Sequence, residues 1–164
     1  YVFNYYWMEL RLRQMLSKIA LYWIVLQAVI SSSLTKLEDR IFCCCSSLTQ
    51  LTISSLISEI GSYVFKECSS LQQISLPSSV KKIRIGAFSS CKNLKEISIP
   101  PSIDAIESYL FEKCKSLERI TLLSPTSIVS IKDPAFSECS SLKYFQIPQS
   151  VLINKNQHFQ IVHH

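Results

Sequence analysis

Cysteine is the residue type whose spacing in this chain most suggests chemistry, because the 164 residues contain seven of them. Four recur at one constant interval and a fifth follows after a slightly longer one, namely Cys45, Cys68, Cys91, Cys114 and Cys139. The chain has no CxxC pair and no cysteine–histidine ligand spacing, so the pattern gives no support to a zinc site. The fixed interval predicts one slot of a repeat, filled each time by a small buried thiol. A disulfide between neighbouring repeats stays open on distance alone, although stacked side chains point the same way.

The other reactive side chains form no catalytic constellation. Glu96 and Glu118 fall on neighbouring repeats, but a paired-acid site needs cleft walls that a bare stack of repeats does not offer. His158, His163 and His164 have no cysteine or acidic partner at ligand spacing, which predicts an exposed tail. The sequence also has no Gly-rich phosphate loop, no H-x-x-x-H pair and no G-x-S-x-G motif. We therefore expect no enzyme activity, no metal and no cofactor.

A repeat must position these residues, and it is clearest in Leu71–Asn93. Its apolar positions return one period earlier and one period later, so that Leu71 corresponds to Leu48 and to Leu94. One further step forward needs two extra residues around Pro125. A fixed period of about 23 residues predicts a solenoid, because each unit has to bury its apolar face on its neighbours.

Each unit is expected to contain three short elements. The L-x-x-I-x-[IL] part, as in Leu71–Leu76, predicts a short strand whose alternate residues face in and out. A Ser-rich turn and a second extended piece around Ile83 follow. In Ala87–Leu94 the apolar residues lie three and four apart, which suits a helical turn. The expected solenoid has parallel strands on one face, with short extended pieces and helical turns on the other.

The two ends of the chain depart from the repeat. Residues 1–33 place three basic residues before an apolar run at 19–30 and three serines, the layout of a secretory signal. Membrane association through residues 8–30 is then open, although the run is short of the ~20 residues of a spanning helix. Equally, an apolar helical stripe in this segment would cap the open end of the solenoid. The solenoid is assigned to residues 34–164, with residues 142–164 as a degenerate C-terminal cap.

The unit L-x-x-I-x-[IL]-P-x-S-[VI]-x-x-I-x-x-x-A-F-x-x-C-x-x resembles the BspA-like leucine-rich repeat. Leu71–Asn93 and Leu94–Ser116 match it best, and the resemblance covers about residues 34–153. The family usually has glycine after the second isoleucine, and here only Gly61 fits. The resemblance implies a curved leucine-rich-repeat solenoid with no enzyme activity, which binds other macromolecules. It also implies a cell-surface or secreted antigen or adhesin.

An intracellular structural or interaction repeat protein, located in the cytoplasm, is the alternative. It is motivated by the buried cysteine column and by the absence of an N-x-[ST] sequon. Nucleic acid is not an expected partner, because the net charge is only +5 and the basic residues of the repeat at 71–93 have no interleaved aromatics.

A partner is expected on the outward strand positions, which lie side by side in a solenoid and make one continuous face. Each repeat contributes three such positions, which form three columns along the solenoid. The residues of one column nearly all carry a hydroxyl, and the other two columns carry charge, amides and one aromatic. The candidate residues are Thr52, Ser75, Lys95, Glu96, Ser98, Glu118, Arg119, Thr121 and Tyr144. Such a surface suits a polar protein or glycan partner better than an apolar ligand. Arg119 and Tyr144 are of the types most often found as interface anchors, although ordinary solvated strand positions would look the same.

Overall fold

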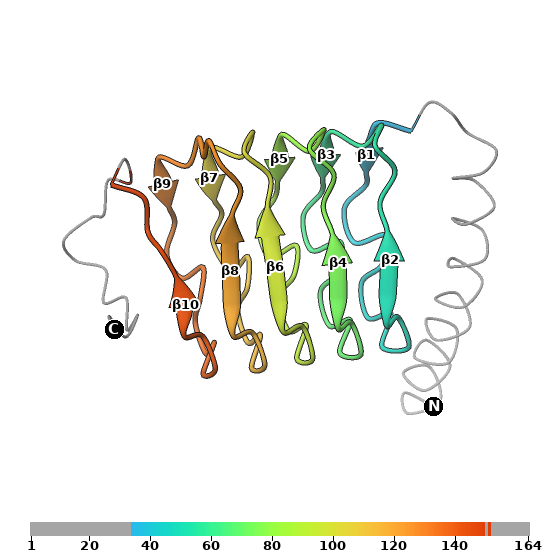
Figure 1. The fold of residues 1–164 in the computed structure, drawn as a ribbon. Helices are drawn as coiled ribbons and strands as arrows, with labels where there is room; N and C mark the ends of the chain where they lie inside the picture. Colours follow the sequence, from blue (N-terminus) through green and yellow to red (C-terminus); the bar gives the residue numbers. More distant parts are fainter. Residues whose placement is uncertain (1–33, 150, 152–164) are drawn as a thin grey trace, which may run out of the picture.

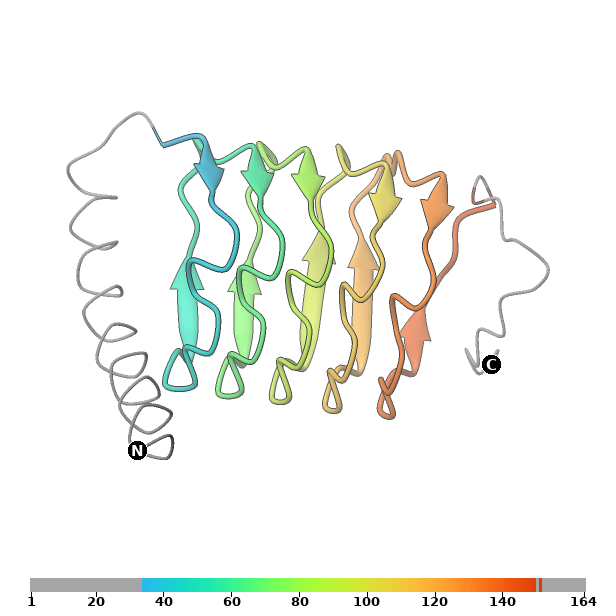
Figure 2. The ribbon, with the colours of Figure 1, turned by 180° about the vertical axis from the view of Figure 1, so that it is seen from behind.

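The computed structural model describes residues 34–149 and 151, which form a solenoid built from two rows of short strands (Figures 1 and 2). One row holds the two-residue strands β1 (Lys36–Leu37), β3 (Glu59–Ile60), β5 (Lys82–Ile83), β7 (Ala105–Ile106) and β9 (Ser130–Ile131). The other row holds β2 (Gln50–Thr52), β4 (Gln73–Ser75), β6 (Glu96–Ile99), β8 (Arg119–Leu122) and β10 (Tyr144–Phe145).

Every strand pair is parallel, and its register follows the period of the sequence. Gln50 pairs with Gln73, and Glu96 pairs with Arg119, so each residue meets its equivalent in the next unit. Tyr144 pairs with Arg119 across a slightly longer interval, because the loop around Pro125 holds the two extra residues. The solenoid with its row of parallel strands is therefore confirmed.

Strand pairing is interrupted midway along both rows, between β4 and β6 and between β5 and β7. At this point the Lys95 amide lies 3.5 Å from the Gln72 carbonyl oxygen, the outer limit of a hydrogen bond. The turns continue across the gap. The amides of Gly86, Phe88 and Ser90 donate to carbonyls of the next unit over 3.1, 3.1 and 2.6 Å.

The turn segments use a regular alternation in place of the expected helical turn. Gly86 and Ser90 have left-handed φ angles of 61° and 62°. Their amides bond to the next unit, whereas the amides of Ser89 and Cys91 bond three residues back within their own unit. Alternate amides are thus satisfied by the neighbouring unit, so the i→i−4 pattern of an α-helix does not form. Residues 34–149 and 151 contain consecutive turns and no helix.

Gly86 lies at a turn position where a side chain has no room. Besides its left-handed φ, the ring of Tyr63 from the preceding unit lies where a β-carbon of residue 86 would be. Tyr63 holds the same turn position with φ of 57°, and so does Tyr109 with φ of 59°. Glycine at residue 86 is therefore needed mainly to make room for the Tyr63 ring, since tyrosine adopts the same left-handed conformation at the equivalent positions.

The core lies between the two rows and is organised by a stack of phenylalanines. Successive ring centroids are 5.3 to 5.9 Å apart, and the ring planes differ by 6° to 13°. The stacked rings are Phe42, Phe65, Phe88, Phe111 and Phe136. The first four are fully buried, as expected for a structural column. The period of the sequence also assigns Phe159 to this column, and Phe159 lies outside the described residues.

Several predictions for the ends of the chain also fall outside the described residues. These are the cap, signal or membrane roles of residues 1–33 and most of the C-terminal cap at 142–164. In the part that the structure describes, none of the secondary structure is a helix with the length and apolar character to cross a membrane.

Candidate binding face

All nine predicted site residues are exposed on the row of β2, β4, β6, β8 and β10. Strand alternation explains this placement, because Ile97 and Ile120 turn into the core while Glu96, Ser98, Arg119 and Thr121 turn out. Register brings Thr52 beside Ser75 and Ser98 beside Thr121, which makes the hydroxyl column. We call this surface the strand face.

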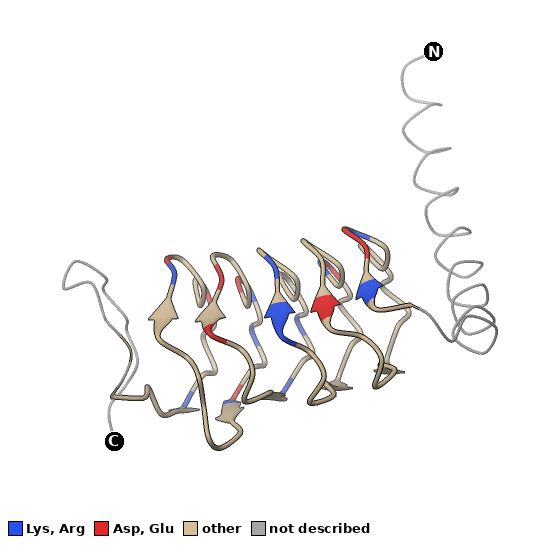
Figure 3. Ribbon diagram, turned by 90° about the horizontal axis from the view of Figure 1, so that it is seen from above, with Lys and Arg blue, Asp and Glu red and all other residues tan. Residues whose placement is uncertain are grey.

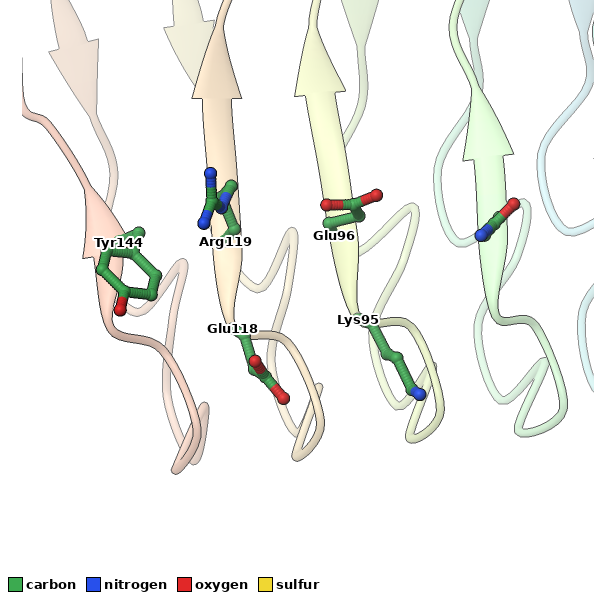
Figure 4. A pocket seen from close by; sticks show the side chains of 6 residues that line it. Lys95, Glu96, Glu118, Arg119 and Tyr144 are labelled. Carbon is green, nitrogen blue, oxygen red and sulfur yellow. The ribbon is translucent and has the colours of Figure 1, made fainter.

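Five of the predicted residues surround a shallow depression of about 290 Å³ in the strand face (Figure 4). It is lined by Lys95, Glu96, Glu118, Arg119 and Tyr144, together with Gln73. Thr52, Ser75, Ser98 and Thr121 lie on the same face but do not line it. Gln73 is an outward residue of β4, and strand alternation already identifies it as part of this face.

Arg119 stacks on Tyr144, with its guanidinium carbon 4.9 Å from the ring centroid. In Figure 4 the two side chains lie side by side on β8 and β10, with Glu96 across from Arg119 on β6. Tyr144 remains 58% exposed, so one side of the stacked pair is open to a partner. Within residues 34–149, neither Glu96 nor Glu118 forms an ion pair, and both carboxylates are available on the open face.

Charges on the opposite row are arranged differently. Figure 3 shows basic and acidic strands alternating along β1, β3 and β5. Glu59 lies 3.8 Å from the Lys36 ammonium and 3.0 Å from Nε of Arg84, and its hydrogen bond raises the pKa of Arg84. Lys132 pairs with Glu107 at 2.7 Å. These charges form ion pairs within the solenoid, whereas in the part of the chain that the structure describes the charges around the depression form none.

The five repeat cysteines form a second ladder inside the core. The Sγ–H groups of Cys68, Cys91, Cys114 and Cys139 donate to the carbonyl of a phenylalanine in the preceding unit over 2.9 to 3.1 Å. Burial raises the pKa of Cys45 and of Cys139 to about 11, and it raises the pKa of the ladder thiols between them further. Cys45, Cys68, Cys91 and Cys114 are buried and Cys139 is partly buried, which confirms the predicted column of packed thiols, and all seven cysteines are free in this structure.

The described residues contain no group of three or more His, Cys, Asp or Glu side chains that could hold a metal ion. His158, His163 and His164 lie outside those residues.

Two features of the site could not be found from the sequence: the choice of Tyr144 over Glu96 as the partner of Arg119, and the hydrogen bonds of the thiols.

The sequence model of the protein family described as the BspA-type leucine-rich repeat region matches residues 35–162 with six copies of the repeat. The chain belongs to the BspA-type leucine-rich repeat family. Leucine-rich repeat domains of this kind generally act as scaffolds that mediate protein interactions. No curated protein matches the chain significantly.

Solved structures of leucine-rich repeat proteins share the fold of this BspA-type chain. The pneumococcal vaccine antigen PcpA is 22% identical with a TM-score of 0.58, over 73% of this chain and 35% of PcpA. The leucine-rich repeat protein of T. pallidum is 24% identical with a TM-score of 0.54, over 68% of this chain and 62% of that protein. A leucine-rich repeat protein from Bacteroides capillosus is 27% identical with a TM-score of 0.51, over 56% of this chain and 64% of that protein. The chain thus spans between about a third and two thirds of these proteins.

Proposed function

We propose that this chain is a non-enzymatic scaffold that binds a protein partner through the strand face, in the manner of a surface antigen or adhesion protein. The observation that carries the proposal is the stacked Arg119–Tyr144 pair beside unpaired carboxylates at the depression. Arginine and tyrosine are enriched among residues that dominate binding energy, especially where they are held rigid before the partner arrives.

The chemistry of the depression favours a protein over an apolar ligand. A small-molecule pocket is usually deep and mostly apolar, whereas this depression is shallow and lined by four charged residues, an amide and one tyrosine. Glu96 of β6 pairs with Arg119 of β8, and Lys95 and Glu118 directly precede them, so the two signs alternate along and across these two units. Such a pattern selects a partner with a complementary array of charges. A polar glycan is the second candidate, since the exposed Tyr144 ring also offers a stacking surface.

A location at the cell surface or outside the cell is part of the proposal. It is supported by membership of the BspA-type family and by the likeness to the pneumococcal vaccine antigen. Fractionation of the full-length native protein tests this part. Recovery in the cytosol alone, with an intact N-terminus, would instead favour an intracellular interaction protein.

The binding face is tested by comparing two double variants of the full chain. R119A/Y144A removes the stacked pair, whereas K81A/K82A removes two exposed lysines from the opposite row and serves as the matched control. Each protein is immobilised and exposed to an extract of cell-surface and extracellular proteins, and the retained proteins are identified. A partner retained by the wild type and by the control, but not by R119A/Y144A, is then purified for titration.

We expect the purified partner to bind R119A/Y144A at least roughly 30-fold more weakly, because truncating an interface anchor costs about 2 kcal/mol or more. Binding that persists after enzymatic removal of glycans from the partner indicates recognition of protein. Loss of binding on glycan removal would favour the glycan candidate. A partner lost only by K81A/K82A would show that a different face is read and would overturn the proposal.

A further inference from the structure

Cys43 and Cys44 stand apart from the cysteine ladder. Both are partly exposed, and their Sγ atoms lie 3.4 Å apart. In later units the same two turn positions hold polar side chains, such as Lys66 and Glu67 or Ser89 and Ser90. The thiols of this pair are therefore not required by the repeat, and they are the two that converge at the surface.

The surroundings of Cys44 bear on its chemistry. Its φ of 63° turns the side chain toward the next unit, where Sγ lies 3.5 Å from Oε2 of Glu67. Burial, followed by the contact with Cys43, raises the pKa of Cys44 to about 12. Cys44 is thus held as a thiol at neutral pH, with a carboxylate placed to accept its proton.

We propose that Cys43 and Cys44 form a thiol–disulfide exchange site that reacts with low-molecular-weight disulfides and closes to a vicinal disulfide. In the first step the Cys43 thiolate attacks a disulfide RSSR, which gives a Cys43–S–SR mixed disulfide and releases RS⁻. In the second step Cys44 transfers its proton toward Glu67, attacks the Cys43 sulfur and expels the second RS⁻. The two thiols are oxidised to one disulfide, and RSSR is reduced to two RSH once both anions are protonated.

The closed pair is expected to be readily reducible. Consecutive Cα atoms are about 3.8 Å apart across a trans peptide, below the ~4.4–6.8 Å of ordinary disulfides. Strained disulfides have higher reduction potentials and are the labile ones. Cys68, Cys91 and Cys114 of the ladder do not compete, because they are fully buried and donate their S–H groups to backbone carbonyls.

Oxidised glutathione is the probe for the test. The folded full-length chain is incubated with it, the remaining thiols are alkylated in denaturant, and the protein is digested with trypsin. The peptide of residues 41–66, which lies between Arg40 and Lys66, contains Cys43, Cys44 and Cys45. We expect two of the seven alkylation sites to be lost, both in this peptide, and to return after mild reduction.

Single variants assign the bridge. C43S and C44S should each abolish closure, whereas C45A and C139A, which alter ladder thiols, should leave it intact. E67Q should accumulate the glutathione adduct, because the second step loses its proton acceptor. Independently of oxidation, phenylarsine oxide should be retained by the wild type and lost by C43S, since trivalent arsenic needs two convergent thiols. Closure that survives C43S, a wild type that stops at the glutathione adduct, or equal reaction of the ladder cysteines would overturn the proposal.

Discussion

Replacing Phe88 with alanine should lower the free energy of unfolding of the solenoid more than any substitution of an exposed residue. Phe88 is fully buried between two rings, with centroids 5.3 Å from Phe65 and 5.8 Å from Phe111. Truncation of a buried phenylalanine to alanine costs about 3–5 kcal/mol, from lost transfer energy and from the cavity that remains. Because the neighbouring rings belong to different units, the cavity opens in the middle of the stack.

Phe88→Leu separates the aromatic part of this cost from the volume. Leucine keeps most of the apolar burial but removes two stacked pairs, each worth about 0.5–1.5 kcal/mol, so a loss of about 1–3 kcal/mol is expected. Urea denaturation monitored by circular dichroism measures the free energy of unfolding of both variants. The slope of this free energy against urea concentration shows whether the surface exposed on unfolding has changed. A matched control is Phe136→Ala, which removes a partly buried ring near the end of the stack and should cost less.

The reasoning would be refuted if Phe88→Ala lowered the free energy of unfolding by less than about 1.5 kcal/mol, well short of the cost of a core cavity. Equal losses for the leucine and alanine variants would show that ring stacking dominates and that packing volume contributes little.

Two further predictions concern the turns and the thiols. Gly86→Ala should destabilise the chain by at least about 1 kcal/mol, because the backbone at residue 86 is left-handed and the added side chain meets Tyr63. Adding Tyr63→Ala should recover the part of this loss that comes from the contact. An unchanged urea midpoint for Gly86→Ala would contradict this. Burial raises the pKa of Cys139 from 9.0 to about 11, so the thiol ionises at lower pH in the unfolded chain than in the folded one. Its contribution to stability is therefore present below pH 9 and is lost between pH 9 and 11. Cys139→Ala should reduce the fall of the urea midpoint over this pH range, and the same fall in the variant and the wild type would count against the prediction.

The period of the sequence was enough to predict the register of the fold. A shift by one repeat pairs Gln50 with Gln73 and Glu96 with Arg119, and the structure pairs the same residues. Register could be predicted because each column is buried in every unit, so a slip of one residue would expose the whole column. The same alternation placed seven of the nine candidate residues on one face, whereas Lys95 and Glu118 directly precede β6 and β8 and line the same depression.

Local geometry could not be predicted in the same way. Tyr63 and Tyr109 adopt left-handed backbone angles that the residue type disfavours. At Tyr63, a hydrogen bond from its amide to the Ile85 carbonyl of the next unit holds this conformation. Arg119 has Glu96 and Tyr144 at the same register on either side, and only the packed structure decides which it contacts. The Cys43–Cys44 contact is likewise invisible to a search for columns, because neither residue occupies the repeated slot.

The contact between Tyr63 and Gly86 also fixes the order in which the units follow one another. Units with the same columns are interchangeable in principle, because each unit contacts only its neighbours. Excision of residues 71–93 would keep every apolar column intact, yet it would bring Tyr109 to the position of Gly86, against the ring of Tyr63. Duplication of residues 48–70 would likewise set one Tyr63 against another. The chain can therefore gain or lose whole units at other junctions far more readily than at this one, where the two neighbours are matched as a pair.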